Sequence, residues 1–554
     1  MVYRNYYLTI NNKLFNALES VVEKHNKHLD KTDKNRISMD KAVFLIHYID
    51  YKKSQVRENS QSSFVRISSQ TLNLFLKKEL KKYKAFLVKH EFIKTIPYCK
   101  INNLAIGYKV LYIRATQKEA KDTYDVYEFL NKEYETFLFK EIDKIESKKK
   151  RAADRNTKHL TKWLNGNEIQ IDWKKALHFI NNGSFSDDKK SQYSSNVNRI
   201  RFKQWHYTRT KNDNRLHSNL TNLKEELRAF ITHKEETLVS LDIKSSQPYL
   251  LAGILNLLKN KSISKLDFIL GGIRSRDVRS KFHSLMNSIS YKPIDITGLE
   301  LYINLICQTD IYAFVNNNLS VDFKEKIKDE SNNDFYIKKT YCTKRSKQII
   351  KSIKKRKFCK SLTLEYMYCS LENYSGGIKE IKRIYPAPVN KFIYDFKYCK
   401  EIETPRKKRK LSDKRKIEKA KKLFPKFLQQ IESFIILDVI TNELSKQYPK
   451  MFMATIHDSV IVTKKHESEV KNYLKNRLLE IFDIPPKIKS EDWTSSLLFY
   501  IVMFFNKSIS FLLTKINLDF TILFPSMKTL KAPSLFTSLL FFSLIIYNSK
   551  ASLL

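Results

Sequence analysis

The chain has 554 residues and a formal net charge of +44, from 102 Lys and Arg against 58 Asp and Glu. This excess argues against an acidic small-molecule specialist and indicates polyanionic partners, nucleic acid first. Glycine occurs only 9 times, and neither G-x-x-x-x-G-K-[ST] nor G-x-G-x-x-G is present, which excludes a P-loop and a Rossmann nucleotide site. The length leaves room for about three domains.

The cysteines and the N-terminus argue against two further classes. The six cysteines form no C-x-x-C pair and do not neighbour regularly spaced histidines, so the sequence predicts neither a structural zinc site nor a disulfide framework. The stretch Met1–Asn11 is polar and aromatic and lacks the charged-then-apolar pattern of a signal peptide. A reducing, cytoplasmic setting is therefore expected.

Residues 1–120 are expected to form a mixed α/β module. The pattern predicts helices at Ile67–Leu76 and Leu80–His90, followed by strands at Phe92–Pro97 and Tyr108–Ile113. Helix, helix, strand, turn, strand is the order of a winged helix, which binds DNA through its second helix and its wing. The alternative is a small α/β module that only packs on its neighbour.

Charge and polarity divide the rest of the chain. Residues 121–195 are expected to form a charged helical linker or thumb-like region, and 196–493 alternate apolar strands and helices. Residues 494–554 contain five Lys and one Asp among many apolar residues, without Arg or Glu. The apolar runs of this segment are shorter than the roughly 18 residues of a membrane span. A membrane-surface anchor is one alternative, but the abrupt change in composition favours a wrong-frame or disordered tail. A membrane contact is expected only if the tail is native.

Two segments of the third region each present a carboxylate. An apolar strand ends at Asp242, and a helix resumes at Pro248, so this carboxylate lies at a turn that is suited to a metal. Two further strands flank His457-Asp458-Ser459, which predicts a hairpin with Asp458 at its tip. Two carboxylates can hold two Mg²⁺ ions about 3.5–4 Å apart for phosphoryl transfer. Taken singly, each aspartate is also what an ordinary turn contains.

A third segment supplies positive charge. A helix from Lys355 to Asn373 would present Arg356 and Lys360 one turn apart on a single face, and Tyr368 two turns further on. The two cations are suited to a triphosphate, and the tyrosine is suited to stacking on a nascent base pair. A solvated basic face is the alternative for the two cations alone.

In this order and spacing, the segments resemble the polymerase core shared by family A DNA polymerases and phage-type single-subunit RNA polymerases. Leu241–Gln247 resembles motif A, and Ile456–Ser459 resembles motif C. The R-x-x-x-K-x-x-x-x-x-x-x-Y spacing that ends at Tyr368 matches motif B. Upstream, Thr210–Phe230 resembles the family A stretch that reads T-G-R-L-S-S, then P-N-L-Q, then an arginine. The resemblance covers residues 205–493.

The resemblance implies a role for each matched residue. Asp242 and Asp458 would bind two Mg²⁺ ions, with Mn²⁺ as an alternative, and Lys360 would protonate the leaving pyrophosphate. The nucleotide would contact Arg356, Lys360, Tyr368 and Gln247. Nucleic acid would contact Arg215, Arg228, one of Gln429 and Gln430, and His457, which would position the primer end.

Several departures from the family pattern leave the choice of sugar open. Gln247 stands where family A DNA polymerases usually have the glutamate that helps to exclude ribose, and Cys369 follows the tyrosine in place of glycine. Ser459 and Leu364 resemble RNA polymerases, whereas the T-G-R-like segment resembles the DNA enzymes. The short N-terminal part also favours a DNA polymerase over a promoter-reading RNA polymerase.

The fold expected on this resemblance is α+β, a right-hand polymerase with an antiparallel palm and helical fingers and thumb behind the winged-helix-like module. The expected function is primer extension on a template, with DNA and nucleoside triphosphates as partners, in the replication of a mobile genetic element. One alternative is a single-subunit RNA polymerase or a primase-like enzyme. The other is a non-enzymatic DNA-binding replication factor with an inactive palm.

Overall fold

The computed structural model describes residues 7–55, 64–98, 104–111, 124–210, 213–290, 296–331, 333–341, 347–369, 375–397 and 413–494. The chain divides into two compact units, Met1–Thr494 and Ser495–Leu554. This division coincides with the change in composition after Trp493. The tail predicted as wrong-frame or disordered lies outside the described residues. No helix in the described ranges is long and apolar enough to cross a membrane.

The described part of the first unit combines helices with antiparallel sheets, so the α+β class is confirmed at this level. Every strand pair in the described ranges is antiparallel. The finer arrangement of palm, fingers and thumb is taken up below as part of the proposed function.

The N-terminal elements follow the predicted order. They are β1 (Leu8–Asn11), α1 (Asn12–Asn26), α2 (Met39–Ser54), β2 (Val65–Arg66), α3 (Ser69–Phe75), α4 (Leu80–Lys89), β3 (Ile93–Ile96), β4 (Gly107–Val110) and β5 (Tyr124–Tyr127). Strands β2, β4 and β3 form one sheet in that order, and β1 pairs with β5. Buried aromatic side chains such as Phe44, Phe75 and Tyr83 fill the core beneath them. The winged-helix assignment of this module stays a prediction.

A long helix and a short α/β segment follow. They comprise α5 (Lys132–Asn165), β6 (Ile169–Ile171), α6 (Trp173–Asn182) and α7 (Asp187–Arg201). Helix α5 is kinked at Thr157, whose hydroxyl donates to the carbonyl of Ala153 at 2.6 Å. Strand β6 pairs with β9 (Ile231–His233), so the region predicted as a charged helical linker or thumb adds a strand to the main sheet.

The main sheet has six strands in the order β14-β15-β10-β9-β6, and β16 also pairs with β10. Its remaining members are β10 (Glu236–Ile243), β14 (Ala454–Ile456), β15 (Ser459–Thr463) and β16 (Ile488–Asp492). Between β6 and β10 also lie β7 (Tyr207–Arg209), β8 (Leu216–Ser218), α8 (Asn219–Asn222) and α9 (Glu225–Arg228). Strand β10 is buried because Leu238, Val239 and Leu241 are apolar and both of its edges are paired.

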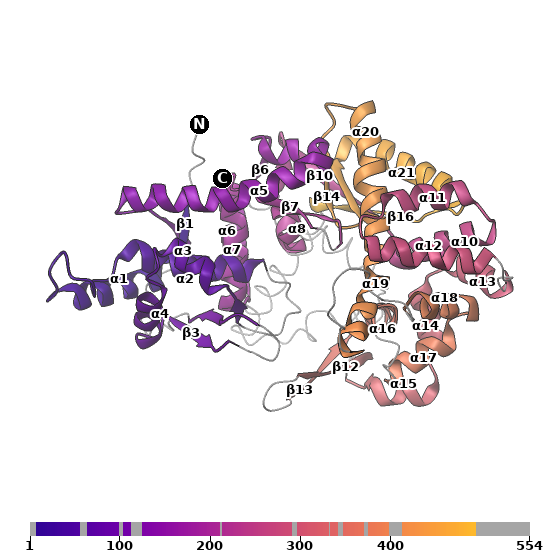
Figure 1. Cartoon of the computed structure of the whole chain (residues 1–554), viewed down its shortest axis with the longest axis horizontal. Coiled ribbons are helices and arrows are strands. Elements are labelled where there is room, and N and C mark those ends of the chain that lie inside the picture. Colours follow the sequence, from indigo (N-terminus) through magenta and orange to yellow (C-terminus); the bar gives the residue numbers. More distant parts are fainter. Residues whose placement is uncertain are drawn as a thin grey trace, which may run out of the picture. The chain divides into compact units, whose positions relative to one another are not determined.

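Helices cover this sheet and extend beyond it. They include α10 (Ser246–Lys259), α11 (Ile263–Gly272), α12 (Arg276–Ser290), α13 (Ile296–Cys307), α14 (Ile311–Asn318), α15 (Val321–Ile327), α16 (Lys355–Tyr368), α17 (Gly376–Ile384), α18 (Ala387–Lys397), α19 (Asp413–Ser433), the π-helix η1 (Phe434–Ile440), α20 (Thr441–Gln447), the 3₁₀ turn η2 (Lys464–His466) and α21 (Glu467–Phe482). A second antiparallel sheet contains β11 (Lys328–Asp329), β12 (Asp334–Tyr341) and β13 (Lys347–Ile353). Helix α10 lies close to α21 because Gly253 has no side chain. A Cβ at this position would lie 2.3 Å from the Phe482 ring. In Figure 1, α19 and its continuation rise from beside α16 to α20.

Candidate active site

The strand register brings the two predicted carboxylates to one end of the main sheet. Asp242 on β10 lies directly opposite Ser459 on β15, and Asp458 is the residue that precedes Ser459. The hairpin between β14 and β15 pairs Ile456 with Ser459, which leaves a turn of two residues. The first of these, His457, has a φ of 55°, as the favoured two-residue hairpin turns require.

The two carboxylates interact electrostatically. Burial, and then the negative charge of Asp458, raise the pKa of Asp242 to about 6. The Ser459 hydroxyl, which donates to Asp242 Oδ1 at 2.8 Å, and the positive charge of Lys360 oppose this increase in the pKa but do not cancel it. Asp242 therefore gains a proton more readily than an exposed aspartate does.

The donor set fits a hard divalent cation. Carboxylate oxygens are the ligands that Mg²⁺ and Mn²⁺ prefer. Within the described ranges, no group of three or more His, Cys, Asp and Glu side chains is arranged to hold a metal. Mg²⁺ is usually held by one or two carboxylates, with waters and substrate phosphates completing its shell. Asp242 and Asp458 are sufficient for a site of that kind.

The predicted motif B helix is α16, which ends at Tyr368, ahead of the expected Asn373. Arg356 is exposed, donates from Nε to Asp310 Oδ2 at 2.8 Å, and lies over the Tyr312 ring at 5.2 Å from its centroid. Lys360, one turn later, is also exposed, and its charge acts on the pKa of Asp242. The helix thus presents a basic face toward the carboxylate pair.

A chain of hydrogen bonds connects three helices and the loop before β8 behind this face. The Tyr368 hydroxyl donates to Gln247 Oε1 at 3.0 Å, and the Gln247 amide donates to Glu432 Oε2. Arg215 donates from Nε to Glu432 Oε1 at 2.7 Å. We call Tyr368, Gln247, Glu432 and Arg215 the buried network. Two of the predicted nucleotide-binding residues and one predicted DNA-binding residue are therefore bonded to one another through Glu432.

Glu432 is the residue of this site that sequence reasoning missed. Its side chain is 1% exposed, and burial raises its pKa to about 7; Arg215 opposes the increase, and the charge of Asp458 adds to it. The same Asp458 charge acts on Arg215 and on Tyr368, which indicates that the buried network and the carboxylate pair share one environment. The sequence does carry a signal for a buried acid here, because Glu432 is one of only two acids in the apolar run 427–440.

The remaining predicted residues lie around this centre. The His457 ring is 6.1 Å from the ring of His217. Arg228 lies 3.9 Å from the Glu491 carboxylate, whose charge also raises the pKa of Asp242. Their predicted contacts with nucleic acid stay predictions.

Of the two glutamines, only Gln430 has its side chain fully buried. Its Oε1 accepts the backbone N–H groups of Arg274 and Ser275 at 3.1 and 3.0 Å, at the start of α12. Gln429 is partly exposed, which makes it the more accessible of the two for a minor-groove contact.

Comparisons with known proteins leave the function to be argued from the chain itself. No family model and no curated protein sequence matches the chain. A solved structure, the POL domain of Pol1 from M. smegmatis in complex with DNA primer-template and dNTP, is similar with a TM-score of 0.33 and 10% identity. The similarity covers 64% of this chain and 66% of that one, just under two thirds of its length.

Proposed function

We propose that the chain is a template-directed nucleotidyltransferase, a family A-like DNA polymerase that extends a primer. The observation that carries this proposal is the register of β10 and β15, which puts Asp242 opposite the residue that follows Asp458. A pair of partly buried carboxylates next to a basic helix is suited to phosphoryl transfer from a triphosphate.

Each residue of the centre has a proposed task. Asp242 and Asp458 hold two Mg²⁺ ions, which when bound would activate the attacking hydroxyl and stabilise the leaving oxygen. Lys360 lies where its ammonium can neutralise the triphosphate and give a proton to the leaving pyrophosphate. Arg356, which Asp310 orients, binds the distal phosphates.

The buried network is proposed to set the shape of the nucleotide pocket. Tyr368 supplies the surface on which the new base pair stacks, and Gln247 fixes the position of its hydroxyl. In this arrangement the main sheet with α10 and α21 is the palm, α16 belongs to the fingers, and α5 belongs to the thumb. The module at 1–120 would be a winged helix that contacts DNA.

Primer extension by the full chain tests the proposal. Labelled primer–template would be given Mg²⁺ with either deoxy- or ribonucleotides, and a second set of reactions would omit the primer. Asp242→Ala and Asp458→Ala should each abolish extension. Asp492→Ala, an acid on β16 of the same sheet, is the matched control and should retain it.

The outcomes separate the candidate functions. Extension with ribonucleotides and without a primer would replace the DNA polymerase by an RNA polymerase or a primase-like enzyme. Wild-type protein that binds DNA without extending it, and whose binding is unchanged in Asp242→Ala, would instead identify a DNA-binding factor.

A further inference from the structure

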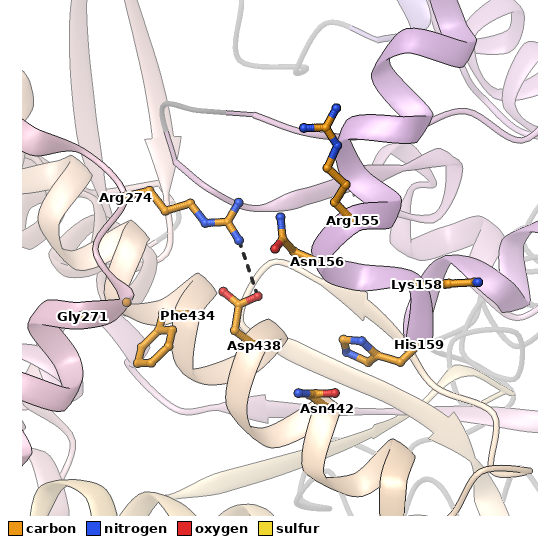
Figure 2. A pocket seen from close by; sticks show the side chains of 10 residues that line it. Arg155, Asn156, Lys158, His159, Gly271, Arg274, Phe434, Asp438 and Asn442 are labelled. Carbon is orange, nitrogen blue, oxygen red and sulfur yellow. Dashed lines mark ion pairs between the residues drawn. The ribbon is translucent and has the colours of Figure 1, made fainter.

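A second concave site lies between the kinked helix α5, the π-helix η1 and the segment that joins α11 to α12. It is a cavity of about 580 Å³, which is within the size range of small-molecule sites. In Figure 2, Arg274 and Asp438 face Asn156 and His159 of α5, and Arg155 extends from α5 at the edge. Neither Asp242 nor Asp458 lines it.

Positive charge predominates in this cavity. Its lining contains Arg155, Lys158 and Arg274 against the single acid Asp438. Burial lowers the pKa of His159 to about 4, so that its ring is neutral and adds a polar but uncharged group. The side chains of Arg155 and Lys158 form no hydrogen bond or ion pair with the described residues. The lining thus carries three cations and one carboxylate.

That carboxylate is already neutralised by another residue. Both oxygens of Asp438 accept hydrogen bonds from Arg209, each at 2.6 Å, and Arg209 is almost fully buried. Arg274 approaches Asp438 only to 3.7 Å. Burial and the neighbouring charge of Arg209 both lower the pKa of Arg274. The guanidinium of Arg274 is therefore held in place without a full counter-charge.

The backbone of the wall is fixed and leaves room for a ligand. The buried Gln430 holds the N–H groups of Arg274 and Ser275, which sets the direction in which Arg274 leaves the chain. A Cβ on Gly271 would meet no atom within 4 Å, so the cavity is open at this residue. Phe434, which packs against the adjacent Gly272, gives this part of the wall an aromatic surface.

We infer that this cavity binds a phosphate-bearing ligand, whose anionic oxygens Arg155 and Arg274 contact from opposite sides. Guanidinium groups bind phosphate through paired hydrogen bonds, and the lining offers the positive charge that a phosphate would neutralise. The phosphate could come from a phosphodiester of a nucleic-acid strand or from a free phosphate compound. The inference does not depend on the proposed polymerase activity.

Two variants of the full chain test it by different means. Arg155→Gln/Arg274→Gln removes two charges, and Lys140→Gln/Lys148→Gln removes two exposed charges from α5 outside the cavity as its control. Gly271→Leu fills the cavity without a change in charge. Gly376→Leu, where a Cβ would meet only Phe323 at 3.7 Å, is its control. Circular dichroism and thermal unfolding check that all four variants fold.

Fluorescence anisotropy would follow a short labelled single-stranded DNA, with thymidine 5′-monophosphate and inorganic phosphate as competitors. We expect each cavity variant to bind the DNA or the competitor about tenfold or more weakly than its control, because hydrogen bonds between charged groups are removed or blocked. For DNA, the salt dependence should also fall by about 0.7 in slope for each phosphate that the variant no longer binds.

The probes identify the source of the phosphate. If the cavity variants lose DNA binding and the small phosphates do not compete with DNA for the wild type, the ligand is a nucleic-acid strand. If the small phosphates compete for the wild type but not for the cavity variants, the ligand is a free phosphate compound. The inference is wrong if both cavity variants match their controls with every probe. These measurements follow binding and require no extension of a primer, so a failed polymerase proposal would leave this result intact.

Discussion

The carboxylate pair on the main sheet and the basic cavity beside α5 have opposite imbalances of charge. In the first, burial and the charge of Asp458 raise the pKa of Asp242 to about 6, and the charge of Lys360 and the hydrogen bond from Ser459 offset only part of this increase. In the second, Asp438 is neutralised by Arg209, and further cations remain. The two aspartates therefore differ in their effect on the fold. Asp438 stabilises the folded chain because it pairs with the buried Arg209, whereas Asp242 contributes little to stability and is available to bind a ligand.

The largest expected effect removes catalysis without a loss of stability. Asp242→Asn should lower primer extension by at least about 10³-fold, the scale of losing a principal electrostatic group from an active site. The free energy of unfolding should not fall, because the substitution relieves repulsion between like charges. Extension assays and urea unfolding of the same preparation check both parts. A loss of stability in Asp242→Asn would show that Asp242, like Asp438, stabilises the fold.

The opposite result is expected in the cavity. Asp438→Ala leaves the buried guanidinium of Arg209 without its partner and should cost about 3–5 kcal/mol of unfolding free energy. Asp395→Ala, which breaks the exposed pair with Lys391, should cost at most about 1 kcal/mol. Urea unfolding compares the two. Equal costs would show that Asp438 does not hold Arg209 in place.

A pH dependence of stability should follow from the acidic site. The pKa values of Asp242 and Glu432 are raised to about 6 and about 7, so these two carboxyls hold more protons in the folded chain than in the unfolded chain between about pH 4 and 7. Buried histidines such as His47 and His159, whose pKa values burial lowers to about 4, act on stability in the opposite direction, so the contribution of Asp242 is read against Asp242→Asn. In EDTA, the stability of wild type relative to Asp242→Asn should fall as the pH rises from about 4 to about 7. Above that range Mg²⁺ should restore it, because the cation binds the ionised pair of the folded state.

Thermal unfolding across this range, with EDTA or Mg²⁺, is the measurement. Asp242→Asn supplies the control and should lose most of the effect of Mg²⁺. A stability of wild type relative to Asp242→Asn that does not fall between about pH 4 and 7 in EDTA would contradict the raised pKa of Asp242.

The smallest effect concerns the hydroxyl of Ser459. Ser459→Ala removes the hydrogen bond at 2.8 Å that favours the ionised form of Asp242, so the pKa of Asp242 should rise further. The pH at which Mg²⁺ begins to stabilise the fold should increase by up to about one unit. Ser490→Ala, on β16 of the same sheet, should leave it unchanged. An identical pH profile for the two variants would exclude the hydroxyl as a determinant.

Sequence patterns located the elements that carry the carboxylates well. The apolar run before Asp242 and the two runs around His457-Asp458-Ser459 form the predicted strands, because alternation and β-branched residues define strands locally. Their pairing also follows from burial, since a shift of one residue would expose the apolar faces. The sequence therefore predicts each strand and the carboxylate at its end.

The buried network and the cavity could not be predicted in this way. Both depend on contacts between residues far apart in the chain, such as Arg215 with Glu432 and Arg209 with Asp438. Local periodicity carries no information about which acid will meet which arginine. The sequence showed only that two acids interrupt the apolar run 427–440, and buried acids need partners.

The π-helix η1 makes the length of the chain critical between these two acids. Glu432 precedes η1 and Asp438 lies within it, and each wide turn holds one residue more than an α-helical turn. Deleting one residue between them would turn the following helix by roughly 100°. Asp438 would then move away from Arg209, and Thr441 away from His159, although no side chain of either site had been replaced. This stretch should therefore tolerate substitutions of similar size far better than any insertion or deletion.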